Sequence, residues 1–326
     1  GGYSGQSGTV EVTATRDTRP PGITCSPILT ANTAPGQCSG VASFTVTATD
    51  NYDPNPSAAC NPPSGSSFAK GVTTVNCAAI DFSLNTAMCS FTVTILDPEP
   101  PRVACPANRV ASTDPGQCSK SNVTYTATAT DNCPEVTVAC SPPSGTRFVK
   151  GPTTVTCTAT DTSANRDQCS FTVTIVDNEP PQVTCPGLIV ASIQPGLCSQ
   201  VVTFNPTASD NCAVTSLGCV PPSGSAFPKG VTSVTCTATD ASGNSRSCGF
   251  LVQILDNELP QIACPGNIVT NTQPGLCLQI VTFNAVATDN CAVTRLLCSP
   301  PSGSTFQKGV TNVTCTAEDA STNSRN

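Results

Sequence analysis

Apolar and polar residues alternate at many places along this chain, and the clearest run is Cys169–Ile175, which reads C-S-F-T-V-T-I. Its Phe, Val and Ile residues occupy every second position, which is the period of a strand with one buried face. Close copies of this run begin at Cys89 and Cys248, each followed by a linker of the form D-x-E-P-P or D-x-E-L-P. We therefore expect a chain of repeats in which this strand and its linker join one repeat to the next.

The repeat period is about 80 residues, because the first cysteines of successive repeats are Cys25, Cys105, Cys185 and Cys264. Repeats of this size bury about two-thirds of the surface of the unfolded chain, so covalent cross-links are expected. The sequence predicts the following organisation: a flexible leader with a donor-type β-strand at 1–19, and repeats at 20–99, 100–179, 180–258 and 259–326. Repeat 4 is expected to be incomplete, because it lacks a counterpart of the strand at Cys248–Leu255.

Repeat 2 serves as the reference for the fold. Alternation predicts strands at 103–105, 122–130, 136–140 and 153–161, and then the strand that begins at Cys169. Turns rich in Gly, Pro and Asn separate these strands, and no segment has a helical period. Roughly seven short strands per repeat favour an antiparallel β-sandwich of immunoglobulin type. The predicted fold class is all-β, a linear array of four disulfide-rich sandwiches in which the last one lacks its final strand.

Composition narrows the function classes. The 326 residues include 22 Cys and no His or Trp, with 14 Lys+Arg against 21 Asp+Glu. Dense cysteine usage indicates an extracellular chain, secreted or at the cell surface, and the absence of His and of C-x2-C spacing argues against zinc. The surface lacks the basic stripe that nucleic acid requires, and no apolar run reaches the length of a membrane span. No Ser/His/Asp or Cys/His set exists, so we expect neither an enzyme nor a catalytic residue.

Several motifs recur in the same order in the repeats. They are P-P-x-V-x-C-P, P-G-x-C, A-T-D-N-C, C-x-P-P-S-G-x-x-F-x-x-G, V-T-C-T-A-T-D and C-S-F-T-V-T-I. This pattern resembles tandem hyalin repeats, the HYR domain, across residues 20–326. The resemblance implies an immunoglobulin-like fold and adhesive or matrix roles outside the cell, and it carries no catalytic residues to transfer.

The cysteines of repeats 2 and 3 form two sets of six, and six cysteines allow fifteen connectivities, between which the sequence alone does not choose. In a sandwich, the D-N-C turn should lie at the same end as the start of the last strand. The predicted pairs are Cys133–Cys169, Cys212–Cys248, Cys140–Cys157 and Cys219–Cys236, which leaves Cys105 with Cys118. Repeat 1 has Tyr52 in place of the D-N-C cysteine and repeat 4 has five cysteines, so Cys89 and Cys291 are the expected orphan thiols.

Acidic residues gather in the linkers and in two loops of the following repeat. Oxygen ligands from a linker and two loops could hold Ca²⁺ and stiffen a joint. The alternative is that Asp and Asn at strand ends bond the backbone of their own turns. The candidate ligands are Asp97, Glu99, Asp131, Asn132, Asp177, Glu179, Asp210, Asn211, Asp240, Asn244, Asp256, Glu258, Asp289 and Asn290.

Two N-x-S/T sequons, at Asn122 and Asn312, predict N-linked glycans on an extracellular chain. The many Ser and Thr residues could also carry O-linked glycans. A lysine recurs in the motif F-x-K-G, where it could bind an anionic polysaccharide or simply belong to a turn. These lysines are Lys70, Lys150, Lys229 and Lys308.

Two functions compete. The first is a structural subunit of an extracellular filament, built from copies of the chain joined head to tail. In this hypothesis the leader donates a strand, with Val10, Val12 and Ala14 on its apolar face, to the incomplete repeat 4 of another copy. The alternative is a four-repeat fragment of a longer adhesion or receptor protein that binds other extracellular proteins or glycans.

Overall fold

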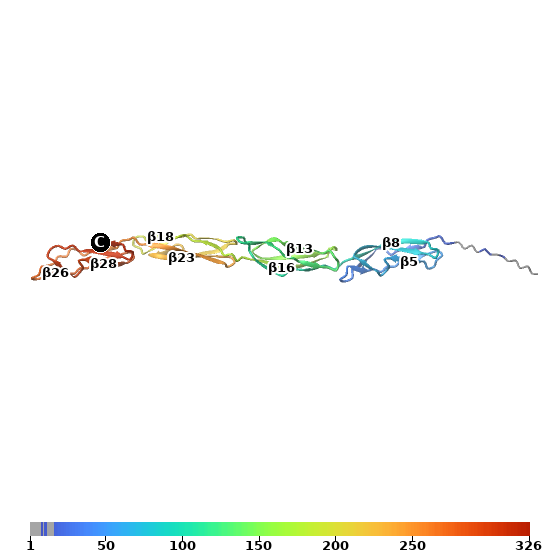
Figure 1. Ribbon diagram of the computed structural model, residues 1–326, viewed down its shortest axis with the longest axis horizontal. Helices are drawn as coiled ribbons and strands as arrows, with labels where there is room; N and C mark the ends of the chain where they lie inside the picture. Colours follow the sequence, from blue (N-terminus) through green and yellow to red (C-terminus); the bar gives the residue numbers. More distant parts are fainter. Residues whose placement is uncertain (1–7, 9, 12–15) are drawn as a thin grey trace, which may run out of the picture. The chain divides into compact units, whose positions relative to one another are not determined.

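The computed structural model describes residues 8, 10–11 and 16–326. The chain divides into two compact units, Gly1–Ala111 with Ser121–Ile175 and Ser112–Lys120 with Val176–Asn326, and each is described separately below. All regular elements among the described residues are β-strands, as Figure 1 shows. This part of the chain therefore contains no helix that could cross a membrane. The predicted all-β class is confirmed.

In the first unit, repeat 1 contains eight strands. They are β1 (Gly22–Thr24), β2 (Leu29–Asn32), β3 (Ser39–Val41), β4 (Thr47–Thr49), β5 (Ser57–Asn61), β6 (Ser67–Ala69), β7 (Gly71–Ile80) and β8 (Thr86–Leu96). One sheet has the order β2-β8-β7-β5, with β2 parallel to β8 and the other pairs antiparallel. The two-stranded ladders β1–β4 and β3–β6 complete the sandwich.

Repeat 2 also has eight strands, one more than the approximate prediction. They are β9 (Arg102–Ala104), β10 (Arg109–Ser112), β11 (Ser119–Val123), β12 (Thr128–Thr130), β13 (Thr137–Ser141), β14 (Thr146–Val149), β15 (Gly151–Thr160) and β16 (Arg166–Val176). The single strand predicted at 122–130 is wrong. Tyr125 exchanges backbone hydrogen bonds with the Ser144 hydroxyl instead of with a neighbouring strand, so the ladder is interrupted between β11 and β12.

In the second unit, repeat 3 repeats the design of repeat 1, with the sheet order β18-β24-β23-β21. Its strands are β17 (Gln182–Thr184), β18 (Ile189–Ser192), β19 (Ser199–Val202), β20 (Thr207–Ser209), β21 (Val214–Val220), β22 (Ser225–Pro228), β23 (Gly230–Asp240) and β24 (Ser245–Leu255).

Repeat 4 has a smaller main sheet, β28-β30-β31. Its strands are β25 (Gln261–Ala263), β26 (Leu278–Val281), β27 (Val286–Thr288), β28 (Val293–Ser299), β29 (Ser304–Gln307), β30 (Thr314–Asp319) and β31 (Ser324–Arg325). Where β23 is flanked by the eleven residues of β24, β30 is flanked by the two described residues of β31. Ile268, whose counterpart Ile189 packs against the core of repeat 3, is 49% exposed.

The core of each of repeats 1 to 3 lies between the main sheet and the short ladders. In repeat 2, the alternate residues of β16 that the sequence predicts to face inward, Phe171, Val173 and Ile175, are all buried. The equivalent residues Val155 and Cys157 of β15 are also buried. The period-two pattern therefore predicts the buried face correctly.

Candidate functional site: the joint between repeats

Each joint brings together short motifs from two repeats. The earlier repeat contributes its P-G-x-C turn and, after repeats 1 and 3, its F-x-K-G lysine; the later repeat contributes its D-N-C turn and a D-x-S-x-N loop. The linker that follows the last strand of the earlier repeat runs between them. Three joints are described, with linkers that begin at Asp97, Asp177 and Asp256. We call them joints 1, 2 and 3; the first lies in the first compact unit, and the residues given below for the other two lie in the second.

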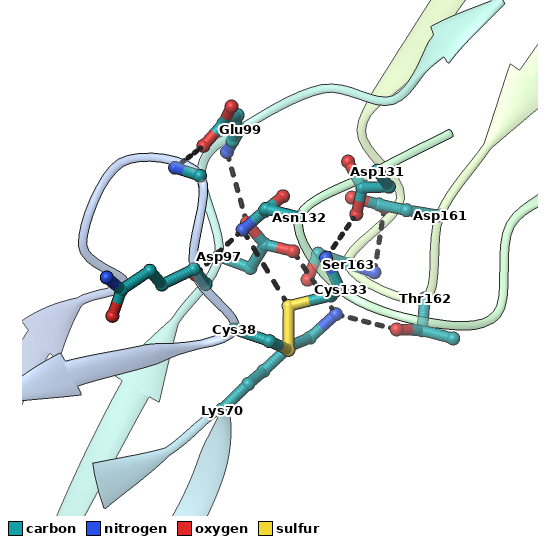
Figure 2. The surroundings of a disulfide bond; sticks show 12 residues. Cys38, Lys70, Asp97, Glu99, Asp131, Asn132, Cys133, Asp161, Thr162 and Ser163 are labelled. Atoms are coloured by element: carbon teal, nitrogen blue, oxygen red, sulfur yellow. Dashed lines mark hydrogen bonds and ion pairs between the residues drawn. A yellow bond between two sulfur atoms is a disulfide. The ribbon is translucent and has the colours of Figure 1, made fainter. Parts of the chain in front are cut away.

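A disulfide crosses each joint. The P-G-x-C cysteine of one repeat is bonded to the D-N-C cysteine of the next, and Figure 2 shows this bond at joint 1. The three bonds are Cys38–Cys133, Cys118–Cys212 and Cys198–Cys291, with sequence separations of 95, 94 and 93 residues. Neighbouring repeats are thus covalently linked twice, once by the chain and once by the disulfide.

The described part of the chain contains ten disulfides, and the seven that do not cross a joint lie within single repeats. One kind joins the first cysteine of a repeat to the cysteine of its last strand, at Cys25–Cys89, Cys105–Cys169 and Cys185–Cys248. The other kind joins facing strands of the main sheet, at Cys60–Cys77, Cys140–Cys157, Cys219–Cys236 and Cys298–Cys315.

These bonds confirm two predicted pairs and correct the others. Cys140–Cys157 and Cys219–Cys236 are confirmed, because their residues face each other on adjacent strands. The predictions Cys133–Cys169, Cys212–Cys248 and Cys105–Cys118 are wrong, because the D-N-C and P-G-x-C cysteines pair across the joints and the first cysteine of each repeat pairs with its last strand. Cys89 and Cys291 are not orphan thiols; the free cysteines of the described chain are Cys264 and Cys277, both exposed.

An asparagine amide connects three parts of joint 1. The Nδ2 group of Asn132 donates to Gln37 O of the earlier repeat at 3.1 Å and to Asp97 Oδ1 of the linker at 3.1 Å. Asn211 repeats this arrangement with Gln117 O and Asp177 Oδ1, both at 3.1 Å. At joint 3 the donor is Asn290, with Leu197 O at 2.7 Å and Asp256 Oδ1 at 3.4 Å.

The linker glutamate reaches back to the earlier repeat. Glu99 Oε2 accepts a hydrogen bond of 3.0 Å from the backbone N of Gly36, in the P-G-x-C turn. Gly36 has φ of +70°, a conformation that favours glycine, so the turn that presents this N–H depends on the residue type. Glu179 and Glu258 bind Gly116 N and Gly196 N in the same way, at 2.9 and 2.8 Å. Three of the candidate calcium ligands therefore have a different partner.

The D-x-S-x-N loop holds the linker from the side of the later repeat. In joint 1, Asn165 Nδ2 donates to the carbonyl oxygens of Asp97 and Glu99, at 2.9 and 3.1 Å. The buried Asp161 fixes this amide at 2.8 Å and accepts from two backbone N–H groups of its own loop. Asn244 likewise donates to the carbonyl oxygens of Asp177 and Glu179, and Asn323 donates to that of Asp256. The loop aspartates thus bond the backbone of their own turns, which was the alternative to calcium binding. The loop asparagines also hold the linker, a role that the sequence did not predict.

Carboxylates approach one another at every joint. Oxygens of Asp177, Asp210 and Asp240 lie within 4.8 Å of one another, as do those of Asp256, Asp289 and Asp319, and Asp97 and Asp131 meet at joint 1. One oxygen each of Asp131, Asn132, Asp210, Asn211, Asp289 and Asn290 is buried without a hydrogen-bond partner among the described residues. The structure thus brings most of the candidate calcium ligands together, as oxygen-rich clusters.

A lysine already supplies positive charge to the linker aspartate. Lys70 Nζ lies 3.5 Å from Asp97 Oδ2 and donates to Thr162 Oγ1 at 2.6 Å, which connects the F-x-K-G turn to the D-x-S-x-N loop (Figure 2). At joint 3, Lys229 Nζ lies 3.8 Å from Asp256 Oδ2. Both aspartates are buried, so these pairs are partly shielded from solvent. The F-x-K-G lysines therefore have a structural role at the two joints.

Burial and hydrogen bonding act in opposite directions on Asp319 at joint 3. Burial alone would raise the pKa of this carboxyl, but hydrogen bonds from Asn323 and from the backbone of Ser321, together with the Lys229 charge, outweigh burial. The net result is a lowered pKa. Asp319 is therefore ionised when the joint is formed at neutral pH.

The segment before repeat 1 is hydrogen-bonded to repeat 1 in the same way as a linker is to the repeat that follows it. Asn85 Nδ2 donates to Asp17 O and Arg19 O at 3.2 and 3.3 Å, as Asn165 does to the linker of joint 1. Asp17 therefore occupies the position of Asp97, and Arg19 occupies that of Glu99. Of the predicted donor strand, Val12 and Ala14 lie outside the described residues, and Val10 is exposed. Both sequon residues, Asn122 and Asn312, are exposed, so their glycosylation stays a prediction that access permits.

Comparison with known proteins identifies the repeats. The sequence matches the HYR domain four times, at residues 16–95, 96–175, 176–254 and 255–326. The chain belongs to the HYR domain family. The matched boundaries fall four residues before those predicted from the prolines, so each HYR match starts within the linker region or last strand described above.

Three curated proteins are similar to this chain in sequence. Hyalin from Strongylocentrotus purpuratus is 35% identical over 332 residues, which cover 97% of this chain and 28% of that protein. Hyalin from Lytechinus variegatus is 34% identical over 278 residues, covering 79% and 52%. A sushi, von Willebrand factor type A, EGF and pentraxin domain-containing protein 1 from Rattus norvegicus is 35% identical over 197 residues, covering 56% and 5%. The chain thus spans about half or less of each relative.

The disulfides also indicate the cellular compartment in which the protein resides. Bonds of this number persist in an oxidising environment and are rare in the cytosol. Together with the HYR family membership, they indicate an extracellular or cell-surface protein.

Proposed function

We propose that this chain is a load-bearing structural element of an extracellular filament or matrix. The observation that carries the proposal is the network of disulfides within and between the repeats. Cys105–Cys169 connects the beginning and end of repeat 2, so the 64 residues that it spans are outside the path of a force applied to the chain ends. From Cys89 to Cys105 the path is only 16 residues (105 minus 89) and runs along the linker of joint 1.

This network limits how far the chain extends when it is pulled. An unfolded segment of 64 residues would add about 220 Å of length at about 3.4 Å per residue, but the disulfide keeps it closed. The second covalent link at each joint, such as Cys38–Cys133, closes a further loop around the linker. The proposal assigns no catalytic chemistry to the chain.

Single-molecule stretching of the full chain tests this function. The oxidised chain should show no length increments near about 220 Å, and a reducing agent should make them appear. A control with Cys60→Ser and Cys77→Ser should behave like the oxidised chain, because this disulfide lies inside the loop closed by Cys25–Cys89. Increments of about 220 Å in the oxidised chain would remove the proposal.

At a finer level, the filament is proposed to form by head-to-tail association of copies of the chain, with the leader pairing to repeat 4. The observation in favour is the short β31 beside β30, which leaves most of that sheet edge without a described partner strand. One feature makes the pairing more demanding. Phe91, Val93 and Ile95 precede Asp97 by six, four and two residues, whereas Val10 and Val12 precede Asp17 by seven and five.

A one-residue offset turns the apolar face outward, so strand donation in this register requires a β-bulge. Deletion of residues 1–15, with Asp17 retained, tests this mode. The full chain should assemble in sedimentation experiments and the shortened chain should remain monomeric. Equal assembly of both would exclude the leader as the donor, while the alternative of a fragment of a longer adhesion protein predicts that neither assembles.

Calcium binding is proposed for the carboxylate clusters of the joints. Asp131 Oδ1 and Asn132 Oδ1 are buried oxygens without a donor among the described residues, and oxygen ligands suit Ca²⁺. Lys70 competes with the ion for Asp97, so Lys70→Met should increase the shift in melting temperature that Ca²⁺ produces. Calorimetry with Ca²⁺ and with a chelator checks this, and identical melting of both proteins under both conditions would exclude calcium.

A further inference from the structure

Three cysteines of repeat 1 form a row across adjacent strands. Cys77 of β7 faces Cys60 of β5 on one side and Cys89 of β8 on the other. Cys77 is bonded to Cys60, and Cys89 is bonded to Cys25, the first cysteine of the repeat. The Sγ atoms of Cys25, Cys77 and Cys89 all lie within 4.8 Å of one another. One sulfur of the Cys60–Cys77 bond therefore lies directly beside a second disulfide.

The same row of facing cysteines occurs in two further repeats. In each, the cysteine of the central strand is bonded to that of the edge strand, and the third cysteine is bonded to the first cysteine of the repeat. The rows are Cys140, Cys157 and Cys169 in repeat 2, and Cys219, Cys236 and Cys248 in repeat 3. The arrangement is thus a property of the repeat and is not confined to one place in the chain.

The two disulfides of repeat 1 differ in the load that they would bear. Cys25–Cys89 has a sequence separation of 64 residues and lies in the path of a force applied to the chain ends. Cys60–Cys77, with a separation of 17 residues, lies inside that loop and bears no load while the outer bond is intact. The load-bearing function proposed above therefore uses the outer disulfide and leaves the inner one without a role.

The inner disulfide is more accessible at one of its two sulfurs. Cys60 lies on β5, an edge strand of the main sheet, and is half-buried. Cys77 lies on β7, between β5 and β8, and is 2% exposed. A small thiol therefore reaches the sulfur of Cys60 more readily than that of Cys77. Attack at Cys60 makes Cys77 the leaving group, so the new thiolate forms in the core beside Cys25–Cys89.

We propose that this row of cysteines is a thiol–disulfide exchange switch that opens the loop closed by Cys25–Cys89. In the first step, the thiolate of a low-molecular-weight thiol bonds to Cys60 Sγ, and the Cys60–Cys77 bond breaks with its electron pair on Cys77 Sγ. In the second step, the Cys77 thiolate bonds to Cys89 Sγ, the Cys25–Cys89 bond breaks, and the released Cys25 thiolate takes up a proton. The second step breaks one disulfide and forms another, so it consumes no further thiol.

The strand register favours Cys89 as the sulfur that Cys77 attacks. Facing residues of antiparallel strands have Cα atoms about 4.5 to 5.5 Å apart, and disulfides span about 4.4 to 6.8 Å. Since Cys77 and Cys89 face each other, a bond between them requires no shift of β7 against β8. Cys25 follows β1, which pairs with β4 in a separate ladder, so a force on the chain draws its released sulfur away from β8. Load therefore keeps the exchanged state open.

Exchange releases a definite length of chain. The bond between Cys77 and Cys89 still closes 12 residues (89 minus 77), so 52 residues (77 minus 25) enter the path of the force. At about 3.4 Å per residue, these add about 180 Å, compared with about 220 Å when Cys25–Cys89 is simply reduced. Exchange and reduction therefore differ in a length that a stretching experiment measures.

Two single substitutions that remove the same disulfide test the exchange. Cys60→Ser leaves the thiol of Cys77 beside the outer bond, whereas Cys77→Ser, the matched control, leaves the thiol of Cys60 on the edge strand. Both are made in the full chain with Cys264→Ser and Cys277→Ser, which remove the two free thiols of the described residues.

Alkylation followed by peptide mapping provides the first measurement. In the Cys60→Ser chain, Cys77 should be found linked to Cys89. Alkylation of Cys25 should be about tenfold greater than in the Cys77→Ser chain, because the attacking thiol is held beside the bond. Equal alkylation of Cys25 in the two variants, or a link between Cys77 and Cys25, would overturn the proposal.

Partial reduction of the unsubstituted chain provides a second measurement, which does not depend on the folding of a variant. A low-molecular-weight thiol is added in small amounts, and the products are alkylated and mapped. The first product that has lost Cys25–Cys89 should have Cys25 alkylated and Cys77 linked to Cys89. Alkylation of Cys25 and Cys89 together, with no Cys77–Cys89 link, would show reduction without exchange and contradict the proposal.

Stretching at constant force separates this inference from the load-bearing function, on which its mechanical consequence rests. Without a reducing agent, the Cys60→Ser chain should lengthen by one step of about 180 Å, and the Cys77→Ser chain should not. If the oxidised original chain lengthens by about 220 Å, the load-bearing function is wrong, and the mapping still decides the exchange. If the original chain resists and the Cys60→Ser chain shows no step, the switch is wrong and the load-bearing function stands.

Discussion

Joint 1 can be compared with the corresponding face of repeat 1, which consists of residues 50–52 and 81–85 and which we call the end face. Both have the D-N pair. Both also have the D-x-S-x-N loop, whose asparagine donates a hydrogen bond to the backbone of the preceding segment. At the next position, joint 1 has Cys133 bonded to Cys38, whereas the end face has the exposed Tyr52. The residue at this position thus decides whether this face of a repeat can form a disulfide with a P-G-x-C turn.

The comparison shows that a joint has two layers. The hydrogen bonds of the asparagines and the linker define where the next repeat lies, and the disulfide makes that arrangement difficult to reverse. On the end face of repeat 1 the polar groups are retained and the covalent lock is missing. The following predictions remove one layer at a time.

Removal of the disulfide of joint 1 should have the largest effect. Cys38→Ser with Cys133→Ser opens a loop with a sequence separation of 95 residues and should lower the free energy of unfolding of the joint by about 2 to 4 kcal/mol. Hydrogen exchange of Gly36 N, which is bonded to Glu99, should accelerate. The control pair Cys60→Ser and Cys77→Ser should destabilise repeat 1 without accelerating exchange specifically at Gly36. Unchanged exchange in the first variant would show that the disulfide does not hold the joint.

Replacement of the bridging asparagine should have the next largest effect. Asn132→Ala leaves Gln37 O and Asp97 Oδ1 without their shared donor and should cost about 1 to 3 kcal/mol in chemical unfolding. Asn51, the counterpart on the end face, is exposed, so Asn51→Ala should be nearly neutral in the monomer. Equal losses for both variants would abolish the distinction between a formed joint and an open face.

Replacement of the linker glutamate should have a smaller effect. Glu99→Gln keeps the size of the side chain but removes the charge that strengthens the bond to Gly36 N, and about 0.5 to 1 kcal/mol should be lost. Arg19→Glu installs the linker residue at the end face and should leave the stability of the monomer unchanged. A thermal scan of both proteins provides the measurement, and a gain of stability for Arg19→Glu in the monomer would be contrary to the account.

Acid should weaken joint 3 through Asp319. Its folded-state pKa is lowered, so the native joint binds fewer protons than the unfolded chain near pH 4. The stability that this group contributes is present above about pH 4, the unfolded pKa, and is lost as the pH falls through the lower folded value. Urea unfolding between about pH 2 and pH 6 should show a shallower acid decline for Asp319→Asn than for the original chain. Parallel declines would exclude this residue as a contributor.

The strands could be predicted from the sequence, because each one follows from the alternation of apolar and polar residues that are neighbours in the chain. Phe171, Val173 and Ile175 are buried as predicted, since a strand packed on one face requires this period. The interruption at Tyr125 was not accessible, because it depends on the hydroxyl of Ser144, which is distant in sequence.

The joint was only partly accessible, because its contacts connect different repeats. The gathering of Asp97 and Asp131 was expected, but Glu99 binds Gly36 instead of joining them. The sequence did contain a signal for the disulfides. Repeat 1 alone lacks the D-N-C cysteine, while all four repeats have the P-G-x-C cysteine, a pattern that fits pairing of each P-G-x-C cysteine with the D-N-C cysteine of the next repeat.

Mapping of the disulfides tests the central claim most directly. The unreduced chain is alkylated, digested and analysed by mass spectrometry for linked peptides. The account predicts that peptides containing Cys38 and Cys133, Cys118 and Cys212, and Cys198 and Cys291 are linked, and that only Cys264 and Cys277 are alkylated in the monomer. Peptides that link Cys133 to Cys169 and Cys212 to Cys248 would contradict it.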